Sequence, residues 1–515
     1  MMQNQPLSIP PLKIITWFIL FVGIFLIIKI QFSIPTLWEA DGYYHIRMAH
    51  LFRTEGMPKQ LLWAKYSYFA THFADKDFLY HYLLVPFTLF SDIFYGAKVA
   101  AALFSILLFL TFYWVIKKYS SEYAVPFFLV LFFLSSQFLE ALGRPRPMIL
   151  AIALMVWFIH SVIKRNSISI FFSMLIYGFM HISALIMVFY AIIIEVLRYL
   201  EVRFFKEQNE VEIEKEFLQS SFSFKSIGIA VFALLLSYGF HPHFPNNLLV
   251  LYLNLFLVPY YAFKGGVLEL GAEFFPINTK DLILGYPSII FVLLFLFYLI
   301  LNKKIRTRFV SKVWVVCGLI LFIAGFFSQR YLLHAYPLLL IGFAACFSDL
   351  IEGEFLEKIL KFKKTLMLSL FVFFIGVIQI TSSAIKQNIY VENIVNSHYE
   401  QVGVWFSKNV PPGETLFHSN WSDSQYFIGL NPQNNYFVTL DPIYMYAWNP
   451  QLYQLYREVA HGKSKDPYYV LKNIFQVHYG YIGRNYFTPM IQQIAQDSRF
   501  TILAQDALGV IFKLN

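Results

Sequence analysis

Charged residues are scarce in this chain of 515 residues: Asp, Glu, Lys and Arg make up only 14%, whereas 58% of the residues are hydrophobic and 20% are aromatic. So little polar surface cannot cover a water-soluble globule, which excludes an ordinary soluble enzyme. A mean hydropathy of +0.56 is typical of a chain that lies largely in a bilayer. The composition therefore predicts an integral membrane protein.

Cysteine is almost absent as well. Cys317 and Cys346 are the only two, neither stands in a metal-binding spacing, and both fall in apolar runs, so we expect buried free thiols. The chain also lacks internal repeats and low-complexity tracts. Its net charge of +9 comes from basic residues scattered among short loops and not from a stripe, which argues against a nucleic-acid partner.

Long apolar runs recur along the first three quarters of the chain, each near the roughly 20 residues that a transmembrane helix needs. The first run has no small-residue cleavage site after it, so we expect an uncleaved signal-anchor. With 78–90 counted as a partial insertion and 167–197 as long enough for a hairpin, about eleven transmembrane helices are predicted. The runs are 14–32, 78–90, 94–116, 123–140, 147–163, 167–197, 226–240, 281–301, 313–327, 331–348 and 365–383.

The loops between these runs predict an orientation. The basic clusters near residues 117, 164, 198–225, 303–312 and 358–364 all fall on one side, which the positive-inside rule assigns to the cytoplasm together with the N-terminus. Compact loops favour a bacterial inner membrane. We therefore expect a polytopic helical module over 1–385, whose outer loops are 35–77 and 240–280.

The composition changes from about residue 386, where Asn, Gln, Pro and Asp return. Apolar runs at 414–418 and 435–440, amphipathic segments near 450–475 and 486–497, and closing strands at 500–504 and 508–513 predict an α/β domain over 386–515. The orientation places this domain outside the cytoplasm.

A cluster of polar and aromatic residues follows the first apolar run, with the sequence WEADGYYHIR at 38–47. Glu39 and Asp41 lie two residues apart, which in an extended segment directs both carboxylates the same way. They could then share a cation or divide the roles of base and stabiliser. An interfacial aromatic belt with solvated charges is the alternative.

Arginines on the expected outer side run against the positive-inside bias. Arg144 and Arg146 stand in an outer turn after Glu140, and Arg330 stands four residues before His334 at the outer end of an apolar run. Because Arg binds phosphate through two parallel hydrogen bonds, an anionic ligand would explain them. A structural ion pair with Glu140 is the alternative.

The outer segment 240–280 begins with His241 and His243 and later carries Glu269 and Glu273. His-X-His is a weak zinc signal without a third and fourth ligand at the usual spacing. Hydrogen bonding to a ligand or to the backbone explains the pair equally well. We expect the Pro-interrupted apolar stretch 248–263 to dip to the interface and return.

The segment 38–47 resembles the acidic first-loop motif of the GT-C superfamily of membrane glycosyltransferases. It is most similar to that of the catalytic subunit of oligosaccharyltransferase, in which an Asp precedes paired aromatics and a nearby Arg. That subunit also has a second acidic motif in its next outer loop, a carboxylate in a long later loop, an Arg near the outer end of a late helix and a soluble C-terminal domain. Asp41, Glu140, Glu269 or Glu273, and Arg330 stand in the corresponding places.

Two features depart from that family. Glu140 is followed by Arg144 and Arg146 where a second acidic residue is typical, and the Trp-Trp-Asp-Tyr-Gly signature for sequon recognition is missing, with NWSD at 420–423 in its place. The resemblance therefore implies a GT-C enzyme with an acceptor other than Asn-X-Ser/Thr, such as a glycan, a lipid or a different protein site.

By this resemblance we expect an inverting glycosyltransferase that takes its sugar from a polyprenyl-phosphate or polyprenyl-diphosphate carrier on the outer face of the membrane. Asp41 and Glu39 would be the catalytic carboxylates, while cations would stabilise the departing phosphate. The phosphate would be bound by Arg144, Arg146, Arg330, His241 and His243, and the acceptor by Tyr44, His45, Arg47, Glu269, Glu273 and His334.

A divalent cation, Mg²⁺ or Mn²⁺, held by Asp41, Glu140 and Glu269 or Glu273, would also neutralise the phosphate. The arginines could supply the same charge, so both alternatives stay open. Two other classes of function remain: a transporter or flippase of lipid-linked sugars, and a non-catalytic assembly subunit.

Overall fold

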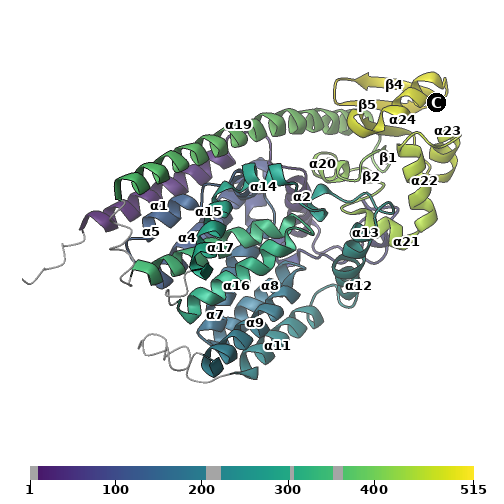
Figure 1. Cartoon of the computed structure of the whole chain (residues 1–515). Helices are drawn as coiled ribbons and strands as arrows, with labels where there is room; N and C mark the ends of the chain where they lie inside the picture. Colours follow the sequence, from purple (N-terminus) through teal and green to yellow (C-terminus); the bar gives the residue numbers. More distant parts are fainter. Residues whose placement is uncertain (1–9, 205–221, 302–306, 352–362) are drawn as a thin grey trace, which may run out of the picture.

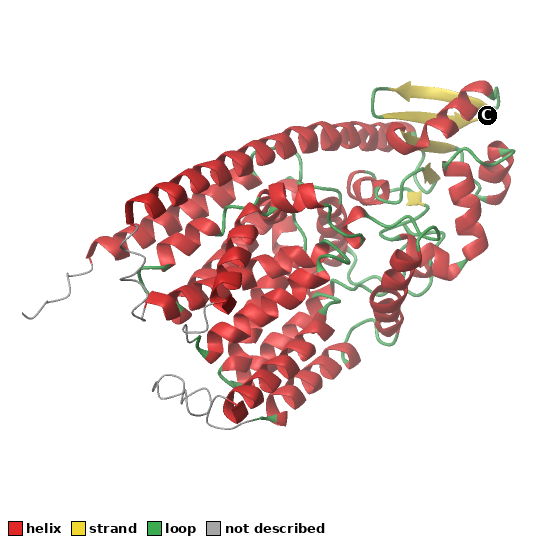
Figure 2. Cartoon of the chain, viewed as in Figure 1, coloured by secondary structure: helices red, strands yellow, loops and turns green. Residues whose placement is uncertain are grey.

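The computed structural model describes residues 10–204, 222–301, 307–351 and 363–515. Helices form a bundle, and a smaller domain with a β-sheet lies at one end of it (Figures 1 and 2). The 47-residue helix α19 (Lys363–Asn409) runs along the outside of the bundle and leads into the smaller domain. The position expected for the domain boundary, residue 385, therefore lies inside one continuous helix.

The other helices of the bundle and its loops are α1 (Pro10–Gln31), α2 (Asp41–Thr54), α3 (Phe78–Leu84), α4 (Ile93–Tyr119), α5 (Val125–Leu131), α6 (Ser136–Gly143), α7 (Met148–Ile163), α8 (Ser167–Met180), α9 (Ala184–Phe204), α11 (Phe224–Gly239), α12 (Asn246–Tyr252), α13 (Val258–Lys264), α14 (Thr279–Gly285), α15 (Pro287–Leu301), α16 (Phe309–Ala324) and α17 (Arg330–Ile351). The hairpin expected in 167–197 is present as α8 and α9, which meet at His181.

Several helices have the length and composition of membrane spans, so the protein is an integral membrane protein. Within the described ranges, four are long and apolar enough to cross a bilayer: Leu12–Gln31, Ile93–Tyr119, Asn246–Lys264 and Arg330–Leu350. The number rises to six if α5 with α6 and α14 with α15, bent by 78° and 93°, each form one span. Five more apolar helices have 10–17 residues. The count of about eleven stays a prediction.

The stretch 248–263 differs from its expected course. It lies within Asn246–Lys264, one of the four candidate spans, in which a π-helical turn at Leu253–Leu257 joins α12 to α13. Pro259 stands in the first turn of α13, where a missing amide hydrogen costs little. Helical hydrogen bonding therefore continues through a segment that proline was expected to interrupt.

The C-terminal domain is α/β, as predicted. Its five-stranded sheet has the order β2-β1-β3-β5-β4, in which β1 is parallel to β2 and β3 while β5 is antiparallel to β3 and β4. The strands are β1 (Thr415–His418), β2 (Asn435–Tyr436), β3 (Tyr479–Gly483), β4 (Phe500–Gln505) and β5 (Gly509–Leu514), and the helices are α20 (Asp423–Leu430), α21 (Pro442–Trp448), α22 (Pro450–Ala460), α23 (Pro467–Tyr469) and α24 (Arg484–Gln496). The central strand β3 is the one that the sequence pattern did not indicate.

The loop 35–77 fastens this domain to the bundle. Arg47 donates from Nη2 to the carbonyl oxygen of Gly429 at 2.6 Å, and Trp63 donates to that of Pro432 at 2.7 Å. A Cβ atom on Gly429 would lie only 2.5 Å from the Cβ of Tyr43, so only glycine allows α20 to approach α2 this closely. The domain is thus held directly against the loop that carries the acidic motif.

Candidate active site

A cavity of about 1750 Å³ lies where the bundle meets the C-terminal domain. Its lining comes from α2, the loop before α3, the turn between α6 and α7, the segment 254–277, the start of α17 and the C-terminal segments 420–426 and 440–444. Ten of the predicted site residues line it: Glu39, Asp41, Tyr44, His45, Arg144, Arg146, Glu269, Glu273, Arg330 and His334. The structure therefore gathers most of the polar clusters that the sequence singled out.

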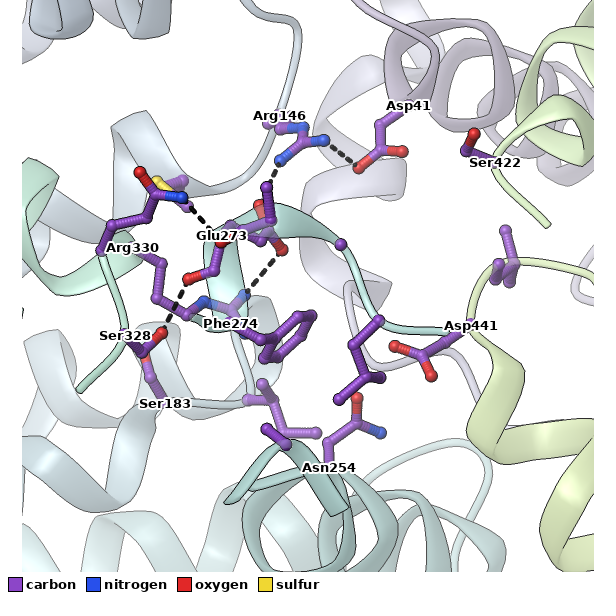
Figure 3. A pocket seen from close by; sticks show the side chains of 18 of the residues that line it. Asp41, Arg146, Ser183, Asn254, Glu273, Phe274, Ser328, Arg330, Ser422 and Asp441 are labelled. Atoms are coloured by element: carbon purple, nitrogen blue, oxygen red, sulfur yellow. Dashed lines mark hydrogen bonds and ion pairs between the residues drawn. The ribbon is translucent and has the colours of Figure 1, made fainter. Parts of the chain in front are cut away.

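Arg146 is the centre of the ionic network in this cavity. Its Nη2 lies 2.8 Å from Oδ2 of Asp41 and donates to Oε1 of Glu39, and its Nη1 lies 3.5 Å from Oε2 of Glu273. Figure 3 shows Asp41 and Glu273 on two sides of this guanidinium. One arginine thereby joins carboxylates from the segments 35–77 and 240–280.

Local sequence explains why the turn presents its arginines here. Ser135 caps α6 by accepting a hydrogen bond from the amide of Phe138, and α6 ends at Gly143. Pro145 and Pro147 cannot continue that helix, so α7 begins only at Met148. The intervening turn carries Arg144 and Arg146 into the cavity.

Glu39 and Asp41 are placed by the start of α2. Glu39 has φ = +68°, an unfavourable conformation for a residue with a Cβ, and its amide donates to Oε2 of Glu392 at 3.3 Å. Asp41 is the first residue of α2, where the positive end of the helix dipole favours a carboxylate. The two side chains meet at Arg146, although the segment is not the extended one that was expected: Glu39 has a positive φ and Asp41 is helical.

Arg144 forms the structural ion pair that the sequence left as an alternative. Its Nη2 donates to Oε1 of Glu140, and its Nε lies 3.4 Å from Oε2 of Glu39. The other oxygen of Glu140 accepts a hydrogen bond of 2.8 Å from Asn388 of α19. Glu140 is therefore held behind the cavity wall and does not line it.

Glu273 is fixed by its backbone and by two arginines. Ser328 donates to its carbonyl oxygen at 2.8 Å, and Nη2 of Arg330 lies 3.7 Å from its Oε1. Burial raises the pKa of Glu273, but the charges of Arg330 and Arg146 outweigh burial and hold that pKa at about 2. Arg330 also stacks on Phe274, with 4.6 Å between its guanidinium carbon and the ring centroid.

Glu269 joins the cavity loop to the C-terminal domain. Its Oε1 accepts hydrogen bonds from Nε of Arg457 at 3.1 Å and from Nε2 of His461. Glu140 pairs with Arg144 and Glu269 with Arg457, while Asp41 and Glu273 face each other only across Arg146, so neither expected set is arranged around one shared Mg²⁺ or Mn²⁺. Across the described ranges, no group of three or more His, Cys, Asp or Glu side chains is arranged to hold a metal ion.

Besides Glu140, three residues expected at the site are placed elsewhere. Arg47 binds Gly429 as described above, and it lies outside the cavity lining together with His241 and His243. His243 contacts the carbonyl oxygen of Pro58 at 2.9 Å, and Nδ1 of His241 accepts from the amide of His243 at 3.1 Å. The two histidines bind backbone, which is the interpretation that the weak zinc signal left open.

One acidic motif of this site was not predicted from the sequence. Asp75, Lys76 and Asp77 all line the cavity, and their two carboxylates have the same spacing as Glu39 and Asp41. Burial raises the pKa of Asp77 to about 6. Burial lowers the pKa of Lys76, but nearby groups including Asp77 outweigh burial and keep that pKa above its usual value, so Lys76 stays a cation. The repeated spacing was the signal that could have found this motif.

No protein-family model matches this sequence, and no curated protein matches it either. The fold does match solved structures. The apo oligosaccharyltransferase of Archaeoglobus fulgidus aligns with a TM-score of 0.57 and 12% identity over 91% of this chain and 69% of that chain. ArnT from Cupriavidus metallidurans, bound to undecaprenyl phosphate, aligns with a TM-score of 0.56 and 12% identity over 98% of each chain.

A second structure of the Archaeoglobus enzyme, AglB, holds an inhibitory peptide and a dolichol-phosphate, and it aligns with a TM-score of 0.57 and 11% identity over 92% of this chain and 69% of that chain. AglB and ArnT are both GT-C glycosyltransferases. The chain therefore has the GT-C fold, which confirms at the level of fold the resemblance drawn from residues 38–47.

Proposed function

We propose that this protein is an inverting glycosyltransferase that moves a sugar or glycan from a polyprenyl-phosphate or polyprenyl-diphosphate carrier to an acceptor on the outer face of the membrane. The observation that carries this proposal is the cavity itself, in which carboxylates and cations from distant segments meet where the apolar bundle joins the C-terminal domain. The lipid phosphates in the AglB and ArnT structures support a lipid-linked donor.

The two walls of the cavity suit the two parts of such a donor. Met155, Ile186 and Leu321 come from bundle helices α7, α9 and α16 and offer an apolar surface to a polyprenyl chain. Trp421 and Tyr426 come from the C-terminal domain, and aromatic faces with polar edges suit a sugar or another polar acceptor. A donor lying along this cavity would place its phosphate near the charged residues between the walls.

Transfer needs one displacement. The acceptor oxygen bonds to the anomeric carbon while the bond from that carbon to the phosphate oxygen breaks, which inverts the configuration. Asp41 acts as the base or as the carboxylate that orients the acceptor hydroxyl. Arg330 and Lys76, together with Arg144 and Arg146, stabilise the negative charge on the departing phosphate.

The membrane orientation that we propose rests on basic residues at the ends of two bundle helices that point away from the cavity. α4 ends beside Lys117 and Lys118, and α7 ends before Lys164 and Arg165, whereas α7 starts at the cavity. By the positive-inside rule the cavity then faces away from the cytoplasm. We place the protein in a bacterial inner membrane, with the N-terminus inside and the C-terminal domain outside.

We further propose that transfer does not depend on Mg²⁺ or Mn²⁺, because guanidinium groups already neutralise the carboxylates that were expected to bind the cation. Chelation with EDTA should leave the rate of transfer within about twofold. A rate that EDTA abolishes and Mn²⁺ restores would contradict this point and reinstate the metal site.

The decisive experiment uses the purified protein with lipid-linked sugars from its host and a host envelope extract as acceptor. Release of free polyprenyl phosphate is followed by mass spectrometry, with Asp41→Asn as the test variant and Asp281→Asn as a control, since Asp281 is exposed and does not line the cavity. Release that requires Asp41 supports a transferase. No release from a pool that binds contradicts it and favours a transporter or flippase.

A further inference from the structure

Two histidines and a carboxylate form a continuous hydrogen-bonded chain in the wall of the cavity. Nδ1 of His45 lies 2.7 Å from Nε2 of His81, and Nδ1 of His81 lies 2.6 Å from Oδ2 of Asp75. The side chains of His81 and Asp75 are 0% and 1% exposed, and His45 is buried. The three residues come from α2, α3 and the loop before α3, so packing alone brings them together.

The carboxylate at one end of this chain sets the protons along it. Burial raises the pKa of Asp75, but the charge that His81 carries when protonated, followed by hydrogen bonds from His81 and from the amide of Asp77, outweighs burial and holds that pKa below its usual value. Ionised Asp75 can only accept, so Nδ1 of His81 donates to it, and the neutral tautomer of His81 accepts at Nε2. His45 must then donate from Nδ1, which leaves its Nε2 without a proton and able to accept one.

His45 lines the cavity one helical turn after Asp41, so the two side chains share a face of α2. The rings of Tyr80 and Tyr44 hold the imidazole, with centroids 5.2 and 5.4 Å from its own. Burial, followed by the charges of His81 and Arg146, keeps the pKa of His45 well below its usual value. The imidazole is therefore neutral near pH 7.

We propose that Asp75, His81 and His45 form a proton relay in which Nε2 of His45 receives the proton of the acceptor hydroxyl. This inference rests on the proposed transferase function and divides its roles: Asp41, held by Arg146 at 2.8 Å, orients the hydroxyl, and His45 removes its proton. His45 is then the catalytic residue, whereas His81 and Asp75 are positioning residues.

The step is balanced. The acceptor oxygen bonds to the anomeric carbon and gives its proton to Nε2 of His45, while the phosphate oxygen leaves with the electron pair of the broken bond. The Nδ1 proton of His45 passes to Nε2 of His81, and the imidazolium that forms there is stabilised by ionised Asp75, which accepts from its Nδ1 and is not itself protonated. One proton thus moves from the acceptor into the buried end of the relay, away from the newly formed glycosidic bond.

Other charged and titratable groups face the relay and belong in any reading of its pH dependence. They are Asp41 and Tyr44 on α2, Lys76 and Asp77 in the loop, Tyr80 on α3, Arg146 in the turn before α7, and His243 beside Asp75. A test of the relay must therefore neutralise Asp75 alone. A change in the pH dependence of the rate can then be assigned to the relay and not to these neighbouring groups.

The test compares Asp75→Asn, His81→Gln and the double variant in the purified full-length protein, with acceptor kinetics and polyprenyl-phosphate binding measured in each. Each single change should lower kcat/KM for the acceptor about 10²-fold, and the double variant should fall no further because the two residues act as one unit. Donor binding should stay within about twofold. His160→Gln is the matched control, because His160 is buried at the other end of the bundle against Tyr119.

The pH dependence of the rate distinguishes a proton relay from a purely structural role of Asp75, because a structural role would leave it unchanged. Asp75→Asn removes the negative charge that favours an imidazolium, so the acid limb of the rate should shift to lower pH by about one unit. The relay would be overturned if the acid limb does not shift, or if the effects of the two single changes on kcat/KM multiply in the double variant. Either result would leave the proposed transferase function intact. A wild-type protein that binds the carrier but transfers nothing would instead overturn the proposed function. If His81→Gln does not fold, the nearly isosteric Asp75→Asn carries the test.

Discussion

Both ends of the helical bundle contain buried ion pairs, but their arginines find different partners. At the end away from the C-terminal domain, Arg198 lies 3.6 Å from Glu195 and donates to the carbonyl oxygen of Ile163 at 2.9 Å. Arg308 donates to Asp349 and to the carbonyl oxygen of Tyr119 at 2.9 Å. These arginines satisfy the last carbonyls of α7 and α4, which have no partner within their own helices.

At the cavity end, the guanidinium of Arg146 instead contacts three carboxylates, those of Asp41, Glu39 and Glu273, all of which line the cavity. Carboxylates held by charge can exchange partners when an anionic ligand enters, whereas backbone carbonyls at a helix end cannot move away. The contrast shows that a buried arginine indicates structure or function according to what it binds and what space it faces.

Arg146→Ala should produce the largest effect and would break the network at the cavity end. Three carboxylates lose their common cation, and we expect kcat to fall about 10³-fold while the protein still folds. The measurement is polyprenyl-phosphate release together with thermal melting. Turnover close to that of the wild type would mean that the network is not part of the chemistry.

Arg308→Ala is the counterpart at the other end. It leaves Asp349, whose side chain is 2% exposed, without this cation, and such a loss costs about 3 kcal/mol of stability. The melting temperature should therefore fall, whereas kcat per folded molecule stays unchanged. A specific loss of kcat at unchanged stability would erase the proposed distinction between the two ends.

Arg330→Ala tests the cation that reaches the cavity from α17. Because a charged hydrogen bond contributes roughly 1.5–3 kcal/mol, binding of polyprenyl phosphate should weaken about tenfold, as measured by the change in melting temperature with ligand concentration. Arg499→Ala, an exposed arginine of the C-terminal domain bound to Asp466 and Asp497, is the control. Equal affinity in both variants would remove Arg330 from the phosphate site.

Asp423 gives the smallest effect and sharpens the contrast with Glu273. Asp423 is buried and accepts from the hydroxyl of Tyr399 at 2.6 Å, and burial raises its pKa to about 7. Because the folded state holds this proton more tightly than the unfolded state, the contribution of Asp423 to stability falls as pH rises from about 4 to 7. The difference in melting temperature between the wild type and Asp423→Asn should therefore decrease as pH rises over this range. A difference that does not change with pH would contradict this prediction.

Much of the fold was predictable because it depends on local patterns. Apolar runs identified the membrane helices, the run 167–197 was long enough for its hairpin, and the alternating segments after residue 410 indicated an α/β domain. The run 435–440 yields only a two-residue strand, β2. Strand β3 was not predicted because its apolar stretch after Tyr479 and Gly480 is too short to stand out in the sequence. It forms because it lies in the centre of the sheet, where β1 and β5 pair with it on either side.

The candidate site was predictable in its residue types but not in its pairings. Glu39 and Asp41 share Arg146 through a turn with positive φ at Glu39 and not through an extended segment, whereas Glu140 pairs with Arg144 and accepts from Asn388 of α19. His241 and His243 were expected at the phosphate but bind backbone. Nothing in local spacing reveals such partners, since they lie on elements distant in the chain.

Composition and periodicity are enough to assign this chain to the membrane and to separate its helical part from its α/β domain, because burial in lipid or in a core acts on each segment by itself. The acidic motif at 38–47 supplied the resemblance to the GT-C superfamily, and the likeness to solved structures confirmed it at the level of fold. Packing alone decides that Arg146 reaches Glu39 across 107 residues, that Arg457 binds Glu269 across 188, and that Asp75 aligns two histidines. Ionic contacts act over only a few ångströms, so their partners exist only once the segments are brought together.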